Sequence, residues 1–216
     1  AVMEPYMMLA ERMGSLLGQM VGSGFESLEL IYSGTIAEKD TRPVTISAIR
    51  GLLGCLMGKD SINFVNATTT LKEMGVKLLE SKTESINGYS NAITMKLTKN
   101  GVINMVQGTV SGNKEKRIVQ LDLYRTYIPT EGDMVIAVID DKPNIIGPCC
   151  VVLGEGNINI GSMHVGRMDE GQPQLMVLSV DQMVPDDLMK RLLQVPGVKN
   201  AKMVEPGLDM FAPDKR

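Results

Sequence analysis

Residues 133–167 read DMVIAVIDDKPNIIGPCCVVLGEGNINIGSMHVGR, and this stretch decides the fold of the last third of the chain. The apolar run DMVIAVI, at 133–139, has the length of a strand. The turn residues DDKPN follow it, and the apolar residues after them predict a helix over about 144–155. The alternating run NINIGSMHVG then predicts a second strand at 157–166.

The residues that follow complete a repeating order of elements. They predict a strand, a helix and a strand at 173–181, 185–195 and 198–205. The resulting order, βαββαβ, is that of a ferredoxin-like unit. Pro148 lies one turn inside the first helix, so we expect that helix to start late or to bend. We expect residues 206–216 to form a loose tail.

The sequence before residue 133 predicts a different arrangement, an α+β domain in which helices cover one side of a sheet. Helices are expected at 4–22, 43–57 and 68–75, and strands at 27–34, 62–66, 76–84, 91–98, 102–110 and 117–125. The turn-rich YIPTEGD, at 127–133, marks a boundary. We therefore predict an α+β chain with one domain at 1–128 and a second at 133–205.

Composition narrows the function. The chain has 216 residues and a net charge of −3, which offers no broad basic field for nucleic acid. Its longest apolar runs are strand-length, so we expect no membrane span. The start lacks a secretory pattern, so we expect a cytoplasmic protein whose three cysteines are reduced. The chain begins at Ala1 without an initiator methionine, so we expect it to be a piece of a longer protein.

Catalytic and cofactor motifs do not emerge from the sequence. His164 has no second histidine, cysteine pair or carboxylate at ligand spacing, so no metal site is expected. No serine lies in a G-x-S-x-G elbow. Gly154, Gly156 and Gly161 miss the spacings of nucleotide loops and follow a helix rather than a strand. We therefore expect this chain to have no catalytic residues and no cofactor of its own.

The loop DDKPN is the better candidate for ligand binding. It leads into a helix, whose free N–H groups suit a carboxylate, while Asp141 can accept hydrogen bonds from an ammonium. Asn159, which opens the second strand, adds an amide that both donates and accepts. These groups match the two ends of an amino acid. The alternative is that Asp141 caps the helix and Asn159 ends a turn.

Two stretches, DKPNIIGPCCVVLGEGNINIGSMHVGR and LMVLSVDQMVPDDLMKRLLQVPGVKNAKMVE, resemble the ACT domain that ends D-3-phosphoglycerate dehydrogenases. Earlier segments resemble the intervening domain of the longer forms of that enzyme. These segments are PYMMLAERMGSLLGQM, DTRPVTISAIRGLL, FVNA, GTVSGNKEKRIVQLD and GDMVIAVIDDKP. Together the resemblance covers nearly all of residues 4–205, and both domains appear in the family's order.

The resemblance implies a regulatory role. The family's NAD-binding and substrate domains precede the resembling region, so we expect this chain to be inert alone and NAD to belong to the parent enzyme. The parent oxidises 3-phosphoglycerate to 3-phosphohydroxypyruvate, the first step of serine synthesis. ACT domains of the family pair across two chains and bind L-serine at that interface, which implies a homo-oligomer. Asp141 and Asn159 match the serine-holding positions, whereas Asn144 and Ile139 replace the family's glycine and its histidine or tyrosine.

The family's intervening domain is described as an allosteric site for phosphorylated substrate or other anions. Arg50, Arg117 and Arg125 stand in the matching segments, and an arginine fork suits phosphate in geometry and charge. From the residues alone each is a surface arginine. Two other functions stay open: a free-standing amino-acid-binding or assembly module, and the regulatory part of an iron–sulfur L-serine dehydratase.

Overall fold

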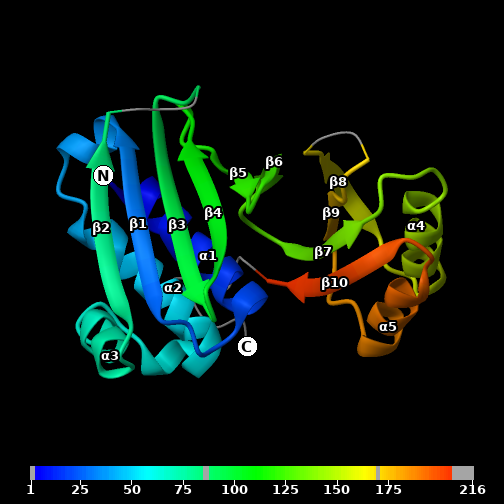
Figure 1. Ribbon diagram of the computed structural model, residues 1–216, viewed down its shortest axis with the longest axis horizontal. Coiled ribbons are helices and arrows are strands. Elements are labelled where there is room, and N and C mark those ends of the chain that lie inside the picture. Colours follow the sequence, from blue (N-terminus) through cyan, green and yellow to red (C-terminus); the bar gives the residue numbers. More distant parts are fainter. Residues whose placement is uncertain (1–2, 85–87, 169–170, 206–216) are drawn as a thin grey trace.

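The computed structural model describes residues 3–84, 88–168 and 171–205, and it places two β-sheets beside each other, each with helices of its own (Figure 1). The expected tail at 206–216 lies outside the described residues. We call the six-stranded sheet with its helices the first unit, and the four-stranded sheet with its helices the second unit. Within the described ranges, no helix combines the length and the apolarity needed to cross a lipid bilayer.

The first unit is an α+β arrangement, as predicted. Its sheet has the order β2-β1-β3-β4-β5-β6, and only the β1–β2 pair is parallel. The strands are β1 (Ser27–Gly34), β2 (Lys77–Thr83), β3 (Asn91–Lys99), β4 (Val102–Val110), β5 (Lys116–Leu121) and β6 (Tyr124–Pro129). The helices are α1 (Glu4–Val21), α2 (Arg42–Met57) and α3 (Ala67–Glu73), with short 3₁₀ turns at Thr35–Glu38 and Lys59–Ser61.

Two predicted strands of the first unit were wrong. Residues 62–66 form a turn, because the Asn63 side chain accepts hydrogen bonds from the N–H groups of Val65 and Asn66 at 2.9 and 3.0 Å. The single strand expected at 117–125 is divided by a tight turn in which Asp122 has a φ of 49°. That turn creates the hairpin β5–β6, so the chain crosses to the second unit at residues 130–132.

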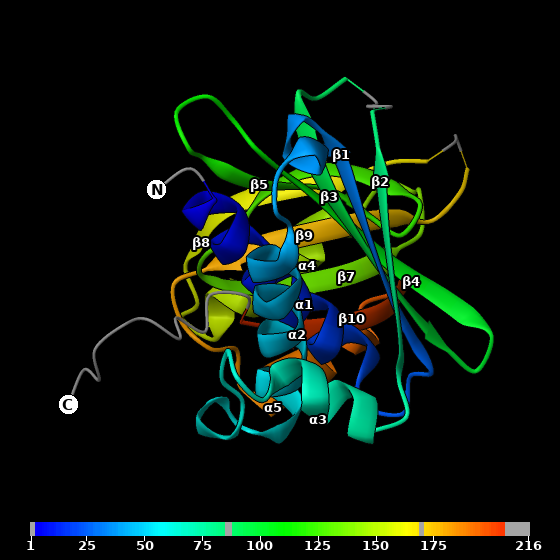
Figure 2. The same cartoon turned by 90° about the vertical axis from the view of Figure 1, so that its left-hand side faces the viewer.

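The helices α1 and α2 lie side by side on one face of the first sheet (Figure 2). Glycines allow their backbones to approach closely. A Cβ built on Gly51 would lie 1.8 Å from the carbonyl oxygen of Glu11, and one on Gly14 would lie 2.2 Å from that of Ala48. Gly14 of α1 and Gly51 of α2 therefore serve close helix packing.

The second unit has the predicted βαββαβ order. Its strands are β7 (Asp133–Ile139), β8 (Ile160–Gly166), β9 (Gln174–Val180) and β10 (Val198–Val204), and its helices are α4 (Ile146–Glu155) and α5 (Asp186–Gln194). The sheet order is β10-β7-β9-β8, all antiparallel, as a ferredoxin-like unit requires. Helix α4 starts at Ile146, which places Pro148 in the first turn, where no backbone donor is needed.

The second sheet is covered on both faces. Val135, Ala137 and Ile139 of β7 pack in the core under α4 and α5. The alternate residues Met134 and Ile136 belong instead to the core of the first unit. Leu175, Val177 and Val204 join them there from β9 and β10. The two units therefore share one apolar core.

Polar contacts secure the edge of this shared core. The Gln19 side chain donates to the Glu205 carbonyl and accepts from the Glu205 N–H, both at 2.9 Å. In the connecting segment, Glu131 forms an ion pair with Arg12 of α1 and a second one with Lys116 at 3.5 Å. The hydrogen bond from Arg12 lowers the pKa of Glu131 below its usual value. These contacts join α1 to both ends of the second unit's chain.

Gly51→Ala tests the helix contact. The added Cβ meets backbone that cannot rotate away, so we expect the free energy of unfolding to fall by about 3 kcal/mol or more. Gly154→Ala is the matched control, because Gly154 is exposed on α4 and a Cβ added there would meet nothing within 4 Å. Alanine at that position is expected to raise stability by about 0.5–1 kcal/mol. Urea unfolding measures both, and equal stabilities of the two variants would contradict the close approach.

Candidate functional site

Asp141 lies just after β7, in the loop that leads into α4. Its carboxylate accepts hydrogen bonds from the Gln174 side chain, which opens β9, and from the Gly171 N–H at 3.2 Å. Arg167, just after β8, places a guanidinium nitrogen 3.5 Å from the same carboxylate. The Asp141 side chain is 16% exposed, whereas that of Arg167 is 70% exposed. Asp141 therefore connects three segments, with one loosely held, exposed partner.

Asp141 is not a helix cap. The N-cap position of α4 is Ile145, and no side chain there bonds to the first turn. The neighbouring Asp140 is fixed differently: its N–H donates to the Gly197 carbonyl at 2.8 Å, and its carboxylate lies 2.9 Å from the Lys199 ammonium. The hydrogen bond from Lys199 lowers the pKa of Asp140. The loop is thus held by β10 on one side, and Asp141 faces β8 and β9 on the other.

The two positions that differ from the family pattern fit this loop. Asn144 has a φ of 68°, the left-handed conformation that glycine adopts freely and that asparagine tolerates better than most residues. With Asn144 the loop backbone therefore takes a conformation that glycine would also adopt at this position. Ile139 is 1% exposed and packs into the core beneath the helices. Its side chain belongs to the helix-covered face of the sheet.

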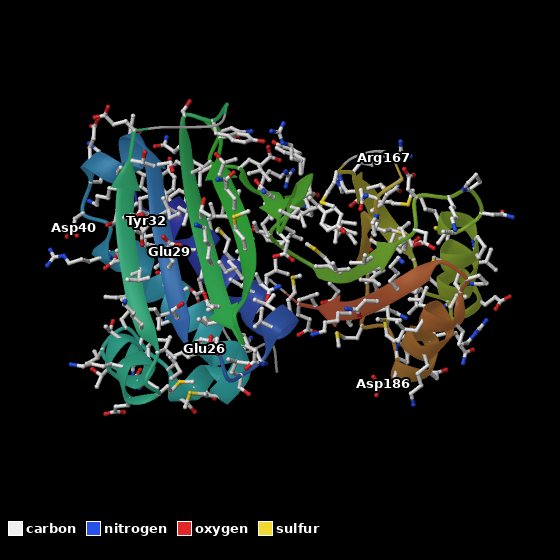
Figure 3. All side chains as sticks on the ribbon, viewed as in Figure 1. Glu26, Glu29, Tyr32, Asp40, Arg167 and Asp186 are labelled. Atoms are coloured by element: carbon white, nitrogen blue, oxygen red, sulfur yellow. The ribbon has the colours of Figure 1, made fainter. Side chains whose placement is uncertain are left out.

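Asn159 lies at the opposite end of the second sheet. Its amide donates to Asp181 at 2.6 Å, just beyond the strand ends where Ile160 pairs with Val180. Asp141, in contrast, follows the end where Ile139 pairs with Gln174. Seven-residue strands separate these ends by roughly 20 Å. Figure 3 labels Arg167, which follows β8, at the top of the second unit, and Asp186, which begins α5, at its bottom. One chain alone does not bring Asp141 and Asn159 together.

Arg50 is enclosed among the helices of the first unit. It is 6% exposed on α2, its guanidinium lies 3.9 Å from the Glu11 carboxylate, and it stacks 4.0 Å from the centre of the Phe64 ring. The sequence-based view of Arg50 as a solvated surface residue is therefore wrong. Its contacts are those of a residue that joins α1, α2 and the turn before α3.

Arg117 and Arg125 lie on the other face of the first sheet. Ile118 and Ile128, which pair across β5 and β6, are buried in the core, so their sequence neighbours point away from it. Arg117 forms an ion pair with Glu115 and stacks 5.4 Å from the Tyr127 ring centre. Exposed Arg125 shares that face. The structure thus places Arg117 against Tyr127, puts Arg125 on the same face of the sheet, and separates Arg50 from both.

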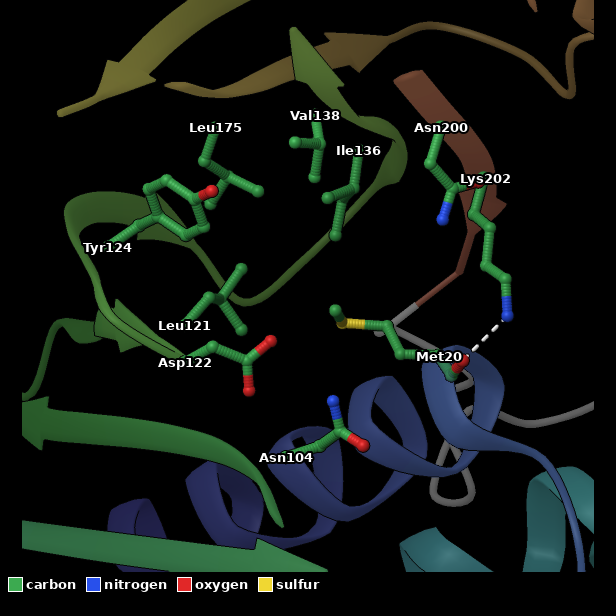
Figure 4. Close-up of a pocket in the computed structure, with 10 residues that line it drawn as sticks. All are labelled: Met20, Asn104, Leu121, Asp122, Tyr124, Ile136, Val138, Leu175, Asn200 and Lys202. Atoms are coloured by element: carbon green, nitrogen blue, oxygen red, sulfur yellow. Dashed lines mark hydrogen bonds between the residues drawn. The ribbon is translucent and has the colours of Figure 1, made fainter. Parts of the chain in front are cut away.

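A cavity of about 180 Å³ lies between the two units, and the sequence did not point to it (Figure 4). Its lining comes from α1, β4, the β5–β6 turn, β7, β9 and β10. No motif connects these segments, because only the packing of one sheet against the other brings them together. Gln174, the donor to Asp141, was missed for a similar reason: a glutamine at a strand start carries no pattern.

The part of the chain that the structure describes contains no candidate metal site. Those residues contain no group of three or more histidine, cysteine, aspartate and glutamate side chains placed to hold an ion. His164 lies on β8, opposite Val177 of β9. Burial raises the pKa of the Cys149 thiol to about 11, which keeps that thiol protonated and unreactive at neutral pH.

Comparisons with known proteins give matches that extend through both units of the chain. Residues 2–122 match the family model of the D-3-phosphoglycerate dehydrogenase intervening domain. D-3-phosphoglycerate dehydrogenases from Synechocystis sp., Methanocaldococcus jannaschii and Bacillus subtilis are 33%, 32% and 30% identical over 204, 202 and 205 residues. The matches cover 94%, 94% and 95% of this chain. They span only 37%, 38% and 39% of the relatives' length.

Asp141→Ala tests whether the carboxylate holds its loop. Its loss leaves Gln174, which is 5% exposed, without its acceptor, so we expect the free energy of unfolding to fall by about 1–3 kcal/mol. Asn159→Ala is the control, since its amide is exposed, and a change within about 0.5 kcal/mol is expected. Denaturant unfolding gives both values. An unaltered stability of Asp141→Ala would show that the three segments do not depend on it.

Proposed function

The chain belongs to the D-3-phosphoglycerate dehydrogenase intervening-domain family, and from this we propose that it is the regulatory and oligomerisation region of such a dehydrogenase. The observation that carries the proposal is the extent of the matches, which run through both units in relatives of that name. More than half of each relative lies outside the match. We assign NAD-dependent oxidation of 3-phosphoglycerate, in serine biosynthesis, to that remaining part.

We further propose that the second unit, residues 133–205, is an ACT domain that senses L-serine, and that residues 1–128 form the intervening domain. The strand order β10-β7-β9-β8, with α4 and α5 on one face, supports the first assignment. The family match over residues 2–122 supports the second. In this proposal the two domains act together, because they share an apolar core.

The proposed serine site forms between two copies of the chain. Strand β8 is at an edge of its sheet, with Asn159 just before it and Arg167, the partner of Asp141, just after it. If two copies pair through this edge with the strands antiparallel, Asn159 of one copy comes next to Asp141 of the other. Asp141 and Asn159, which are far apart within one chain, would then form one site only when two chains pair.

The chemistry of the site follows from the partners of Asp141. Gln174 and the Gly171 N–H fix the carboxylate, and the exposed Arg167 is the partner that a ligand ammonium can displace. The serine carboxylate faces the uncapped first turn of α4, whose N–H groups carry partial positive charge. Both charged ends must find partners, because an unmatched end would cancel the gain of binding. Serine binding at a subunit interface would bias the orientation of the domains.

For the first unit we propose an anion site at Arg117, which stacks on Tyr127, and Arg125, which lies on the same face of the sheet. A phosphorylated small molecule or another anion fits two guanidinium groups on an open surface. Arg50 does not join this site, because it lies among the helices on the opposite face with Glu11 and Phe64.

Titration of L-serine into the wild-type chain and two variants tests the proposal. Asp141→Ala removes a charged partner, so we expect a loss of about 1.5–3 kcal/mol, or roughly tenfold to a hundredfold in affinity. Asn159→Ala removes a neutral amide and should cost less. Asn113→Ala, which alters an exposed asparagine in the turn between β4 and β5, is the matched control and should bind as the wild type does.

A mixture of the two variants places the site at the interface. In an equal mixture with free exchange about half of the dimers are hybrids, and each hybrid contains one intact site and one doubly altered site, so wild-type affinity should return at about a quarter of the wild-type stoichiometry. Absence of heat from the wild type at millimolar serine would refute serine sensing. A mixture that binds no better than its components would refute the interface.

A further inference from the structure

The cavity between the two units combines an apolar wall with polar groups at its rim. Figure 4 shows the side chains around an open centre. The apolar wall consists of Met20, Leu121, Ile136, Val138 and Leu175, and the polar rim of Asn104, Asp122, Tyr124, Asn200 and Lys202. At about 180 Å³ it is smaller than the roughly 300–1,000 Å³ of pockets for drug-sized ligands. It is therefore of a size for an amino acid or a similar small molecule.

Asp122 is the acidic group of this rim, and the fold places it firmly. It occupies the turn between β5 and β6, and one carboxylate oxygen accepts the Met105 N–H at 2.7 Å. Within the described ranges, no lysine or arginine forms an ion pair with it. Its carboxylate points toward the centre of the cavity in Figure 4. A negative charge beside an apolar wall attracts a cation that has an apolar body.

Lys202 provides a positive charge on the opposite side of the same rim. Its ammonium donates to the Met20 carbonyl at 2.6 Å, near the C-terminal end of α1. That bond uses one of its three donors. Asn200, two residues earlier on β10, adds an exposed amide to this side. The rim therefore offers an acceptor for an ammonium on one side and donors for a carboxylate on the other.

We propose that this cavity binds a small aliphatic ammonium compound, with the ammonium on Asp122 and a branched apolar body against Met20, Tyr124 and Val138, which are half-buried members of the lining. Two kinds of molecule share this chemistry, a simple branched alkylamine and an apolar α-amino acid such as L-leucine. The amino acid adds a carboxylate that Lys202 and Asn200 can meet. This site lies on the face of the second sheet opposite α4 and α5, and it is distinct from the proposed serine site.

Occupation of the cavity would link the two units and the Asp141 loop. The ligand contacts both units, so it binds best to one relative placement of the sheets. Leu175, which lines the cavity, is the neighbour of Gln174, which donates to Asp141 from the other face of β9. A movement of the first residues of β9 would therefore alter both the cavity and the contacts of Asp141. The cavity is placed to couple an aliphatic ligand to the loop of Asp141.

Calorimetric titration of the full chain with three probes tests the inference. L-leucine and 3-methylbutylamine should bind, and 4-methylpentanoate, which has no ammonium, should not. Tighter binding of L-leucine than of the amine identifies an amino-acid site that uses Lys202, and equal binding identifies an amine site. No heat from any probe at millimolar concentration would mean that the cavity holds only water, and the inference would fail.

Asp122→Asn is the diagnostic variant, because it removes the charge and keeps the oxygen that accepts from Met105. Asparagine also tolerates the positive φ of this turn. We expect affinity for both ammonium probes to fall about tenfold or more. Asp60→Asn makes the same chemical change at an exposed position away from the cavity and should leave affinity unaltered. Binding that survives Asp122→Asn would overturn the assignment.

Two further variants complete the test. Asn200→Trp adds bulk at the exposed rim without altering the core, so it should abolish binding while the thermal melt stays as in the wild type; unchanged binding would contradict the location.

Asp141→Ala should keep L-leucine binding even if it loses L-serine binding. Failure of the serine site would then be distinguishable from failure of this one, because each depends on a different aspartate.

Discussion

The burial of one face of the four-stranded sheet against the first unit is the constraint on which the rest of the structure depends. A β-sheet has two faces, and each apolar face must be covered. Helices α4 and α5 cover one face, and Met134, Ile136, Leu175, Val177 and Val204 of the other lie within the core of the first unit. Separation of the units would expose these side chains to water, at about 25 cal/mol for each Å² of apolar surface.

This shared core positions the Asp141 loop, strand β8 and the cavity. It presents the helix-covered face of the second unit, with Asp141 and Gln174, away from the first unit. It leaves β8 at one end of the second sheet's strand order, with its Gly166 end close to the Arg125 backbone of β6. The cavity beside Asp122 forms where the residues of the two units do not pack fully against each other. The perimeter contacts of Gln19 and Glu131 then fix the two units in register.

Much of this fold was predictable from the sequence, because alternation and helical spacing report which faces are buried. The βαββαβ order is an example, with its apolar strands and the late start of α4 at Ile146, which puts Pro148 in the first turn. At two places a turn formed by a single polar side chain made the prediction from the hydrophobic pattern wrong. Asn63 closes a turn where a strand was expected, and Asp122 reverses the chain inside an apolar run. Neither effect appears in a hydrophobic pattern.

The sites were less predictable, because they depend on partners far away in the chain. Asp141 was identified as a candidate, but its donor Gln174 is 33 residues away and carries no motif. Arg50 and Arg117 looked alike in the sequence, yet one is buried under the sheet and the other lies on its open face. The cavity needs the pairing of two sheets, so no single segment indicates it.

Differential scanning calorimetry of the chain tests the shared core most directly. If the two units depend on one apolar interface, they unfold together, in a single transition whose calorimetric and van't Hoff enthalpies agree. Two resolved transitions, or a calorimetric enthalpy about twice the van't Hoff value, would show that the units are stable independently. That result would contradict the account in which the covered sheet face holds the molecule together.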